Sequence, residues 1–125
     1  MIAIDSSSLI SFLSGDAGPD VEAVDIALSS TQAVLPPVVR CEMLSDPALP
    51  ASAREAIRQL PLLPISEGFW DRAGLLRSKL IAKGKKAKLA DALIAQVCLD
   101  HDVPLITRDR DFLEIAKVSK LRLVP

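Results

Sequence analysis

The sequence contains few of the residues from which several common kinds of site are built. It has two cysteines, Cys41 and Cys98, and one histidine, His101, among 125 residues. The cysteines do not have the spacing of a metal site, so we expect both to be small core residues. A single histidine cannot form a histidine-based metal centre, and His101 is expected to be solvated near a helix end. Any metal bound by this chain is therefore expected to have oxygen ligands.

The sequence also lacks long apolar segments. Hydrophobic residues make up 50% of the chain, but no run approaches the ~18 to 20 residues that a membrane span requires. The first ten residues contain no basic region, no sustained apolar stretch and no small-residue cleavage site, which argues against a secretory signal. No repeat or linker divides the sequence. We therefore expect one cytoplasmic domain over residues 1–125, with no membrane contact.

The charge has little excess of either sign, but it is unevenly distributed. The net charge of -1 does not by itself indicate a nucleic-acid-binding protein. Residues 72–88 contain seven basic side chains and no acidic one, whereas residues 1–46 contain seven acidic side chains and the single base Arg40. This asymmetry is compatible with a basic surface for a polyanion beside an acidic centre, and a solvated helix face would explain it equally well.

Short apolar runs alternate with helical patterns along the chain. The expected strands are residues 1–4 (MIAI), 33–35 (AVL), 62–65 (LLPI), 104–107 (PLIT) and 121–124 (LRLV). The expected helices lie within residues 6–14, 19–30, 36–45, 46–61, 67–84 and 88–102. Gly84 is expected to end the fifth helix. Because strands alternate with helices of these lengths, we predict an α/β fold, a three-layer α/β/α sandwich with a mostly parallel central sheet.

Two acidic residues follow predicted strands. Asp5 ends the first apolar run, and Asp109 comes two residues after the run PLIT. In open α/β sheets, ligands bind outside the carboxyl ends of the strands, where the strand order switches direction. If both strands are parallel, the two carboxylates emerge at the same edge of the sheet.

Two further acids interrupt apolar helical faces. Asp91 is followed by apolar residues at i+3, i+4 and i+7, and Glu42 follows Val38 and Val39. A carboxylate in such a place is costly unless it is hydrogen-bonded, protonated or bound to a cation. At about 5 Å and an effective dielectric constant of about 20, two carboxylates repel by roughly 3 kcal/mol. A divalent cation would compensate for four acids gathered at one edge.

Each of these acids also has a purely structural explanation. Asp5 could cap a helix, Asp91 could favour a helix N-terminus, and Asp109 could form a turn. Glu42 could pair with Arg108 or Arg110. Four acids on one edge are harder to explain by four independent roles. Oxygen ligands favour Mg²⁺ or Mn²⁺, which commonly acts on phosphate substrates and activates water for phosphodiester hydrolysis.

Four segments in order resemble the motifs of a PIN domain of the VapC-like toxin type: AIDSSSLI, VVRCEML, LADALIA and LITRDRDF. The resemblance covers essentially the whole chain. It implies a single-strand-selective ribonuclease that is the toxin of a toxin–antitoxin pair, forms a homodimer and is inhibited by its cognate antitoxin. It also implies that one or two Mg²⁺ or Mn²⁺ ions are held by an acidic cluster of Asp5, Glu42, Asp91 and Asp109.

Several neighbouring residues complete the expected site. Either Asp109 or Asp111 could point at the metal. We prefer Asp109, because Asp109 lies nearer the strand end. Ser6 and Thr107 are placed to hydrogen-bond the ligands or the substrate. Because the chain is slightly acidic overall, RNA binding would depend on local basic side chains. These side chains are Lys83, Lys85, Lys86, Lys88, Arg108 and Arg110.

Two other functions remain open. An aspartate-based phosphotransfer or phosphatase domain would also place an aspartate after the first strand. The haloacid dehalogenase pattern, however, requires an acid at the position of Ser7, and a receiver requires a lysine where Arg108 stands. The second alternative is a non-catalytic module whose acidic groove binds a basic peptide. Labelling of Asp5 by an acyl phosphate would identify the first, and the absence of magnesium binding would favour the second.

Overall fold

The computed structural model describes residues 1–124. Its strands are β1 (Ile2–Ile4), β2 (Ala33–Val34), β3 (Leu105–Ile106) and β4 (Leu123–Val124). Its helices are α1 (Ser6–Leu13), α2 (Pro19–Ser29), α3 (Pro37–Leu44), α4 (Ala51–Gln59), α5 (Phe69–Ala82), α6 (Leu89–Asp100) and α7 (Asp111–Val118). Among these residues, no helix is both long and apolar enough to cross a lipid bilayer.

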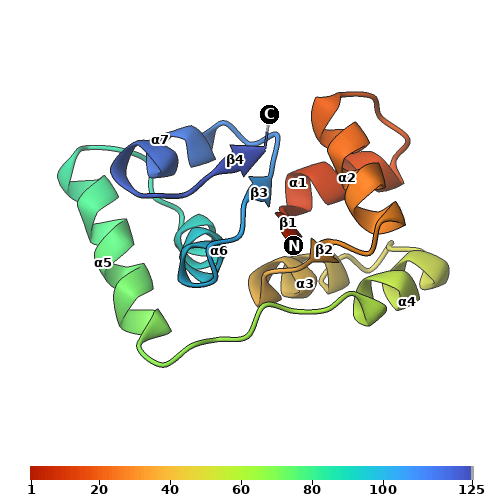
Figure 1. Cartoon of the computed structure of the whole chain (residues 1–125), viewed down its shortest axis with the longest axis horizontal. Coiled ribbons are helices and arrows are strands. Elements are labelled where there is room, and N and C mark those ends of the chain that lie inside the picture. The colour runs from red at the N-terminus through yellow and green to blue at the C-terminus, as the bar shows by residue number, and fades with distance from the viewer. Residues whose placement is uncertain (125) are drawn as a thin grey trace.

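The four strands form one parallel sheet in the order β2-β1-β3-β4. Ala3 in β1 pairs with Val34 on one side and with Leu105 on the other. All three side chains are almost completely buried, as expected for a parallel sheet with both faces covered. The short aliphatic runs therefore form the centre of the molecule (Figure 1).

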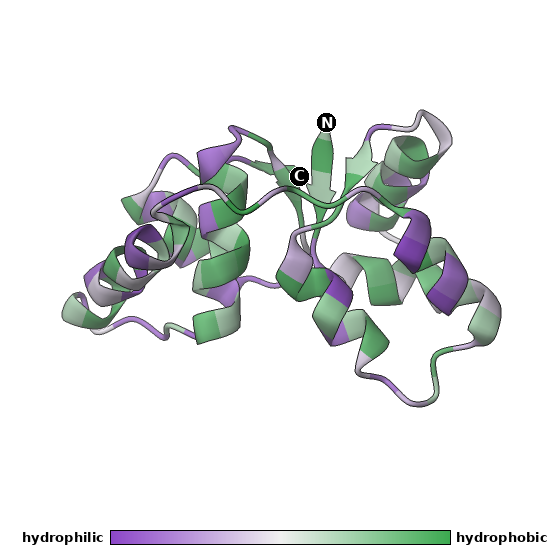
Figure 2. Ribbon diagram, turned by 90° about the horizontal axis from the view of Figure 1, so that it is seen from below, coloured by the Kyte–Doolittle hydropathy of each residue, from purple (hydrophilic) through white to green (hydrophobic). Residues whose placement is uncertain are grey.

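Helices lie on both sides of the strands (Figure 2). Helices α5, α6 and α7 pack against one another on one side, and α1 packs against α2 and α3 on the other. Phe69 from α5 and Phe112 from α7 are among the largest fully buried side chains. This arrangement confirms the predicted α/β/α class with a parallel central sheet.

Gly84 ends α5 as predicted. Its φ is +70°, a left-handed conformation that glycine adopts without strain. Its N–H donates to the carbonyl of Ile81 at 2.9 Å, and the N–H of Lys85 donates to the carbonyl of Leu80 at 2.9 Å. These two bonds form a Schellman motif. The motif turns the chain back so that the lysine-rich segment leads directly into α6.

The structure differs from the prediction at two elements. Helix α7 was not predicted, because it has only eight residues and follows a run of alternating charges. Its sequence signal is the pair of buried residues Phe112 and Ile115, three positions apart. The expected strand at residues 62–65 forms only an isolated bridge between Leu62 and Leu35. That segment therefore borders the sheet beside β2 without becoming a full strand.

The rare residues occupy three different environments. Cys98 is buried, as predicted, but Cys41 is exposed, so the prediction that both lie in the core is wrong. Helix α3 buries Val39 and Met43, and this i, i+4 stripe leaves Cys41 on the opposite side. His101 follows α6 at its C-cap position, as expected for a helix end. Its Nε2 lies 2.7 Å from the carbonyl oxygen of Pro64, so the ring is not simply solvated.

Candidate metal centre

The strand order places the ends of β1 and β3 at a switch point. The chain moves from β1 to β2 on one side and later enters β3 on the other side of β1. The N–H of Asp5 donates to the carbonyl of Ile106 at 2.9 Å, so Asp5 and Thr107 leave the sheet side by side. A switch point is the usual ligand-binding position in open α/β sheets.

Asp5 is buried at this edge, with a relative exposure of 4%. Its Oδ2 accepts hydrogen bonds from Ser7 Oγ at 2.7 Å and Thr107 Oγ1 at 2.8 Å. Asp5 stands at the N-cap position of α1, but its carboxylate makes no capping bond, so the helix-cap explanation is wrong. Two hydroxyls from opposite ends of the sequence hold this carboxylate at the sheet edge.

Ser7 was not predicted to contact Asp5, whereas Thr107 was expected to hydrogen-bond the ligands or the substrate, and its Oγ1 donates to Asp5. The signal for Ser7 is its position two residues after a strand-ending acid, within the first turn of a helix. Its hydroxyl also lies 3.2 Å from Thr107 Oγ1. The three polar groups therefore form one connected network across β1 and β3.

Three other carboxylates converge beside this edge. Asp91 is in the first turn of α6, Asp109 is in the loop after β3, and Asp111 begins α7. One carboxylate oxygen from each residue lies within 4.8 Å of the other two. At this separation, each ionised pair repels by roughly 3 kcal/mol at an effective dielectric constant of about 20. The arrangement is suited to an oxygen-preferring cation.

The electrostatics of Asp91 reflect this crowding. Burial raises its pKa most strongly, and the charges of Asp109, Asp5 and Asp111 raise it further, while Lys88 lowers it. The resulting pKa is about 6, compared with an ordinary value of 3.8. Asp5 thus acts on the same site even though it lies outside the group of three. A bound cation would stabilise the ionised form of Asp91.

Asp109 has a structural role as well as a place in the cluster. Its Oδ1 accepts the N–H of Asp111 at 2.9 Å, and its own N–H donates to Thr107 Oγ1 at 3.0 Å. The turn that would explain Asp109 structurally is therefore present, beside its place in the cluster. Since the structure brings both Asp109 and Asp111 to Asp91, geometry does not separate them, and the preference for Asp109 as the ligand stays a prediction.

Glu42 lies outside the group of three carboxylates. It is exposed on α3, so the prediction that it sits on a buried stripe is wrong. The stripe is formed by Val39 and Met43, which are both buried. Ser6, the neighbour of Asp5, donates from its Oγ to Glu42 Oε1 at 2.7 Å. Glu42 therefore approaches the edge through Ser6, and its role as a metal ligand stays a prediction.

The sequence of residues 2–118 matches the family model described as PIN domain. The chain belongs to the PIN-domain family. PIN domains are generally nucleases, which agrees with an acidic cluster at the switch point. Comparison with curated protein sequences gave no significant match.

Solved structures from bacteria share the fold of this PIN domain. VapBC2 from Rickettsia felis, bound to a promoter DNA fragment, has a TM-score of 0.69 at 18% identity over 99% of this chain and 98% of that chain. VapBC-5 from Mycobacterium tuberculosis has a TM-score of 0.70 at 21% identity over 98% and 96%. VapBC-1 from nontypeable Haemophilus influenzae has a TM-score of 0.73 at 19% identity over 99% and 97%. At these identities the likeness supports the fold.

The lysine-rich loop of this PIN domain borders the acidic cluster. Nζ of Lys86 and Nζ of Lys88 each lie 3.9 Å from Asp111 Oδ2, and Lys85 Nζ lies 3.6 Å from Glu114 Oε2. Lys83 occupies the C-cap of α5, on the other side of the Gly84 turn. Most of the basic residues predicted to bind RNA are thus close to the acidic cluster in sequence or in space. Arg110, the residue between the two loop acids, is exposed.

Arg108 differs from the other bases because its side chain is held by Asp20. Arg108 Nε donates to Asp20 Oδ2 at 2.8 Å, and Nη2 donates to Oδ1 at 3.0 Å. Ser8 Oγ also donates to Asp20 Oδ2 at 2.8 Å. Chiefly because of the hydrogen bonds from Arg108, the pKa of Asp20 falls to about 2. This network was not predicted, and it ties the loop that carries Asp109 to the start of α2.

Proposed function

We propose that this PIN domain is a cytoplasmic metal-dependent endoribonuclease and the toxin of a toxin–antitoxin pair. The observation that carries the proposal is the convergence of Asp91, Asp109 and Asp111 at the switch point, beside the buried Asp5. The donor set consists of oxygens only, which favours Mg²⁺ or Mn²⁺. The raised pKa of Asp91, caused first by burial and then by the neighbouring carboxylates, supports a cation at this position, because a cation favours the ionised carboxylate.

Asp91, Asp109 and Asp111 would hold the ion, with Asp5 and Glu42 as further ligands or as groups that bind its waters. A divalent ion bound in this position would polarise a phosphoryl oxygen and lower the pKa of a bound water. Ser7 and Thr107 orient Asp5 through its Oδ2. Ser6 orients Glu42 in the same way. These hydroxyls keep the carboxylates in place before substrate binds.

RNA is the proposed substrate because the sequence motifs resemble those of VapC-like toxins, and basic side chains beside the acidic cluster would bind its phosphate backbone. Lys86 and Lys88 lie near Asp111, where they can contact phosphates next to the scissile bond. Lys83, Lys85 and Arg110 extend this basic surface. Phosphate contacts of this kind bind a backbone without selecting its sequence.

An antitoxin is the proposed protein partner, and a homodimer is the proposed assembly. VapBC-5, one of the similar solved structures, is described as a member of the VapBC family of toxin–antitoxin systems. The resemblance of the four sequence motifs to VapC-like toxins supports the same partner. Co-expression with an antitoxin candidate, followed by measurement of the mass of the complex, would test both parts.

Cleavage assays test the nuclease proposal directly. The wild-type protein is incubated with single-stranded RNA, duplex RNA and single-stranded DNA, with Mg²⁺ or Mn²⁺ and with excess chelator. We expect cleavage of single-stranded RNA only, abolished by chelator and by Asp91→Asn. Asp25→Asn is a matched control, because Asp25 is exposed on α2. Unchanged cleavage in excess chelator would overturn metal dependence, and labelling of Asp5 by acetyl phosphate would favour phosphotransfer.

A further inference from the structure

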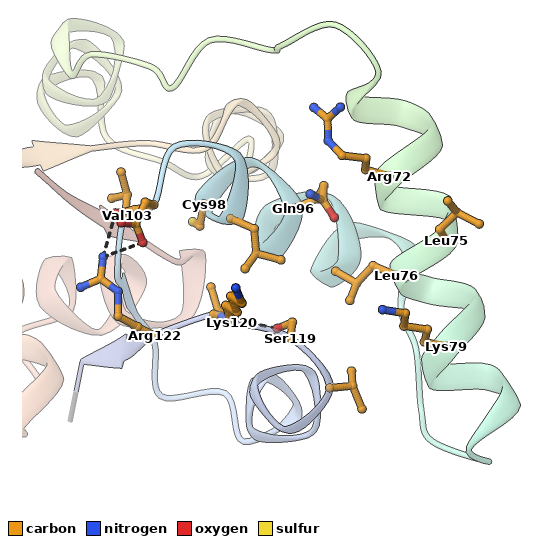
Figure 3. A pocket seen from close by; sticks show the side chains of 14 residues that line it. Arg72, Leu75, Leu76, Lys79, Gln96, Cys98, Val103, Ser119, Lys120 and Arg122 are labelled. Carbon is orange, nitrogen blue, oxygen red and sulfur yellow. Dashed lines mark hydrogen bonds and ion pairs between the residues drawn. The ribbon is translucent and has the colours of Figure 1, made fainter.

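A cavity lies away from the acidic cluster. Its volume is about 610 Å³, and it is an open cavity bordered by α5, the C-terminal half of α6 and the segment that follows α7 (Figure 3). Asp91 is at the other end of α6. This helix has 12 residues and therefore spans about 18 Å. The cavity is distinct from the candidate metal centre.

Basic side chains from several elements line the cavity, and two of them are paired with acids. Arg72 on α5 is neutralised by Asp100, with Nε–Oδ1 and Nη2–Oδ2 distances of 2.9 and 2.7 Å. Arg122 donates from Nη2 to Asp102 Oδ1 at 3.2 Å. These two cations are paired, so they add little net charge to the lining.

The other two cations of the cavity have no such partner. Lys79 and Lys120 are exposed, and neither makes a salt bridge within residues 1–124. Lys79 points from α5 across the cavity towards the segment that carries Lys120 (Figure 3). Two uncompensated cations therefore face one space in a chain whose net charge is -1. The cavity is complementary to an anion.

The floor between these lysines is aliphatic. Leu76 and Leu121 each have a relative exposure of 6%, and Leu99 and Val118 also line the cavity. The lining contains no aromatic side chain among the described residues. Nucleobases are bound mainly by stacking on aromatic rings, so this lining does not favour a nucleotide or an RNA base. A hydrocarbon body would bury apolar surface here instead.

We propose that this cavity binds a small aliphatic anion. Its carboxylate or phosphate group lies between Lys79 and Lys120, and its hydrocarbon chain packs on Leu76, Leu99 and Leu121. The volume is within the range of about 300 to 1,000 Å³ that is typical of small-molecule pockets. The site is independent of the nuclease proposal, because none of its lining residues belongs to the acidic cluster.

Calorimetric titration tests the proposal with defined probes. Decanoate and decyl phosphate are titrated below their micelle concentrations, with decanol as the uncharged probe and acetate as the probe without a chain. We expect saturable binding of one decanoate or one decyl phosphate per chain, and much weaker binding of decanol and acetate. The two anionic probes distinguish a carboxylate site from a phosphate site.

Charge-reversal variants show whether the binding occurs in the cavity. Lys79→Glu and Lys120→Glu should each weaken binding of the preferred probe by about tenfold, whereas Arg58→Glu, an exposed control on α4, should not. Asp91→Asn should bind the probe like wild type even where it no longer cleaves RNA. Unchanged melting temperatures would show that each variant folds.

The position of the bound probe provides a second readout. Methyl NMR spectra should show probe-induced shifts at Leu76, Leu99 and Leu121. The proposal would be overturned by the lack of saturable binding of both anions, by equal binding of decanol, by affinities unaffected by both lysine reversals, or by shifts confined to methyl groups outside the cavity.

Discussion

Arg108 and Asp20 form a bidentate ion pair between two segments that are 88 residues apart in sequence. Asp20 is only 8% exposed, and Gly18 leaves room for the pair. A Cβ at position 18 would lie 2.8 Å from Asp20 Oδ1 and 3.1 Å from Arg108 Nη2. The pair fastens the start of α2 to the loop between Thr107 and Asp109, so it positions one acid of the candidate metal centre.

Asp20→Asn should destabilise the protein and loosen this loop. We expect a loss in the free energy of unfolding on the order of 1 to 2 kcal/mol at pH 7, because Arg108 loses its charged partner. Urea unfolding measures this loss, and Asp25→Asn is the exposed control. Manganese affinity measured by calorimetry should also fall. A variant that matches wild type in both measurements would show that the pair does not position the loop.

The lowered pKa of Asp20 predicts that the free energy of unfolding decreases at low pH. Its pKa is about 2 in the folded state, compared with 3.8 ordinarily. The unfolded chain therefore binds the proton more readily, and the contribution of this group, present above pH 3.8, is lost as pH falls towards 2. Urea unfolding between pH 4 and pH 2 should show a shallower loss for Asp20→Asn than for wild type.

The raised pKa of Asp91 predicts the opposite dependence without metal. With a folded-state pKa of about 6, the native state holds the proton more tightly, so stability falls as pH rises from about 4 through 6. Asp91→Asn should remove this slope and raise metal-free stability on the order of 1 kcal/mol at pH 7. It should also reduce the magnesium-induced rise in melting temperature. A variant that melts below wild type in chelator would indicate that Asp91 has a structural role instead.

Asp109 and Asp111 should respond differently to the same substitution. Lys86 and Lys88 partly compensate the charge of Asp111, whereas the structure pairs Asp109 with no cation among the described residues. In metal-free melts, Asp109→Asn should raise the melting temperature, since asparagine keeps the Oδ1 acceptor for the N–H of Asp111. Asp111→Asn should be nearly neutral. The reverse order would identify Asp111 as the more crowded acid and the better candidate ligand.

The lysine-rich loop, residues 83–88, should control the salt dependence of RNA binding. Replacing Lys83, Lys85 and Lys86 with alanine should weaken binding and reduce the slope of log K against log salt by about 2, because fewer counterions are released. A double alanine variant at Lys79 and Lys120 is the control, since these lysines belong to the separate cavity. If the triple variant has an unchanged slope, the loop is only a solvated surface.

Some features of the site could be predicted because they depend on neighbours in sequence. The aliphatic runs before Asp5 and Thr107 indicated strands, and parallel strands bring their carboxyl ends to one edge. Gly84 could be recognised as a helix end because a left-handed residue is needed there. The orientation of Glu42 could not be decided in this way, because both Val38 and Val39 precede it and either could have defined the buried face of α3.

The sequence by itself determined the α/β class, the ends of the central strands and the restriction of the candidate metal ligands to oxygen atoms. Each follows from local spacing and side-chain chemistry. Only the tertiary structure decided that Ser7 and Thr107 share Asp5, that Arg108 is held by Asp20, and that Lys79 and Lys120 face one cavity. Apart from the hydrogen bond between Ser7 and Asp5, these arrangements bring together residues far apart in the chain. Their distances depend on strand register and on how the helices pack, which no local pattern specifies.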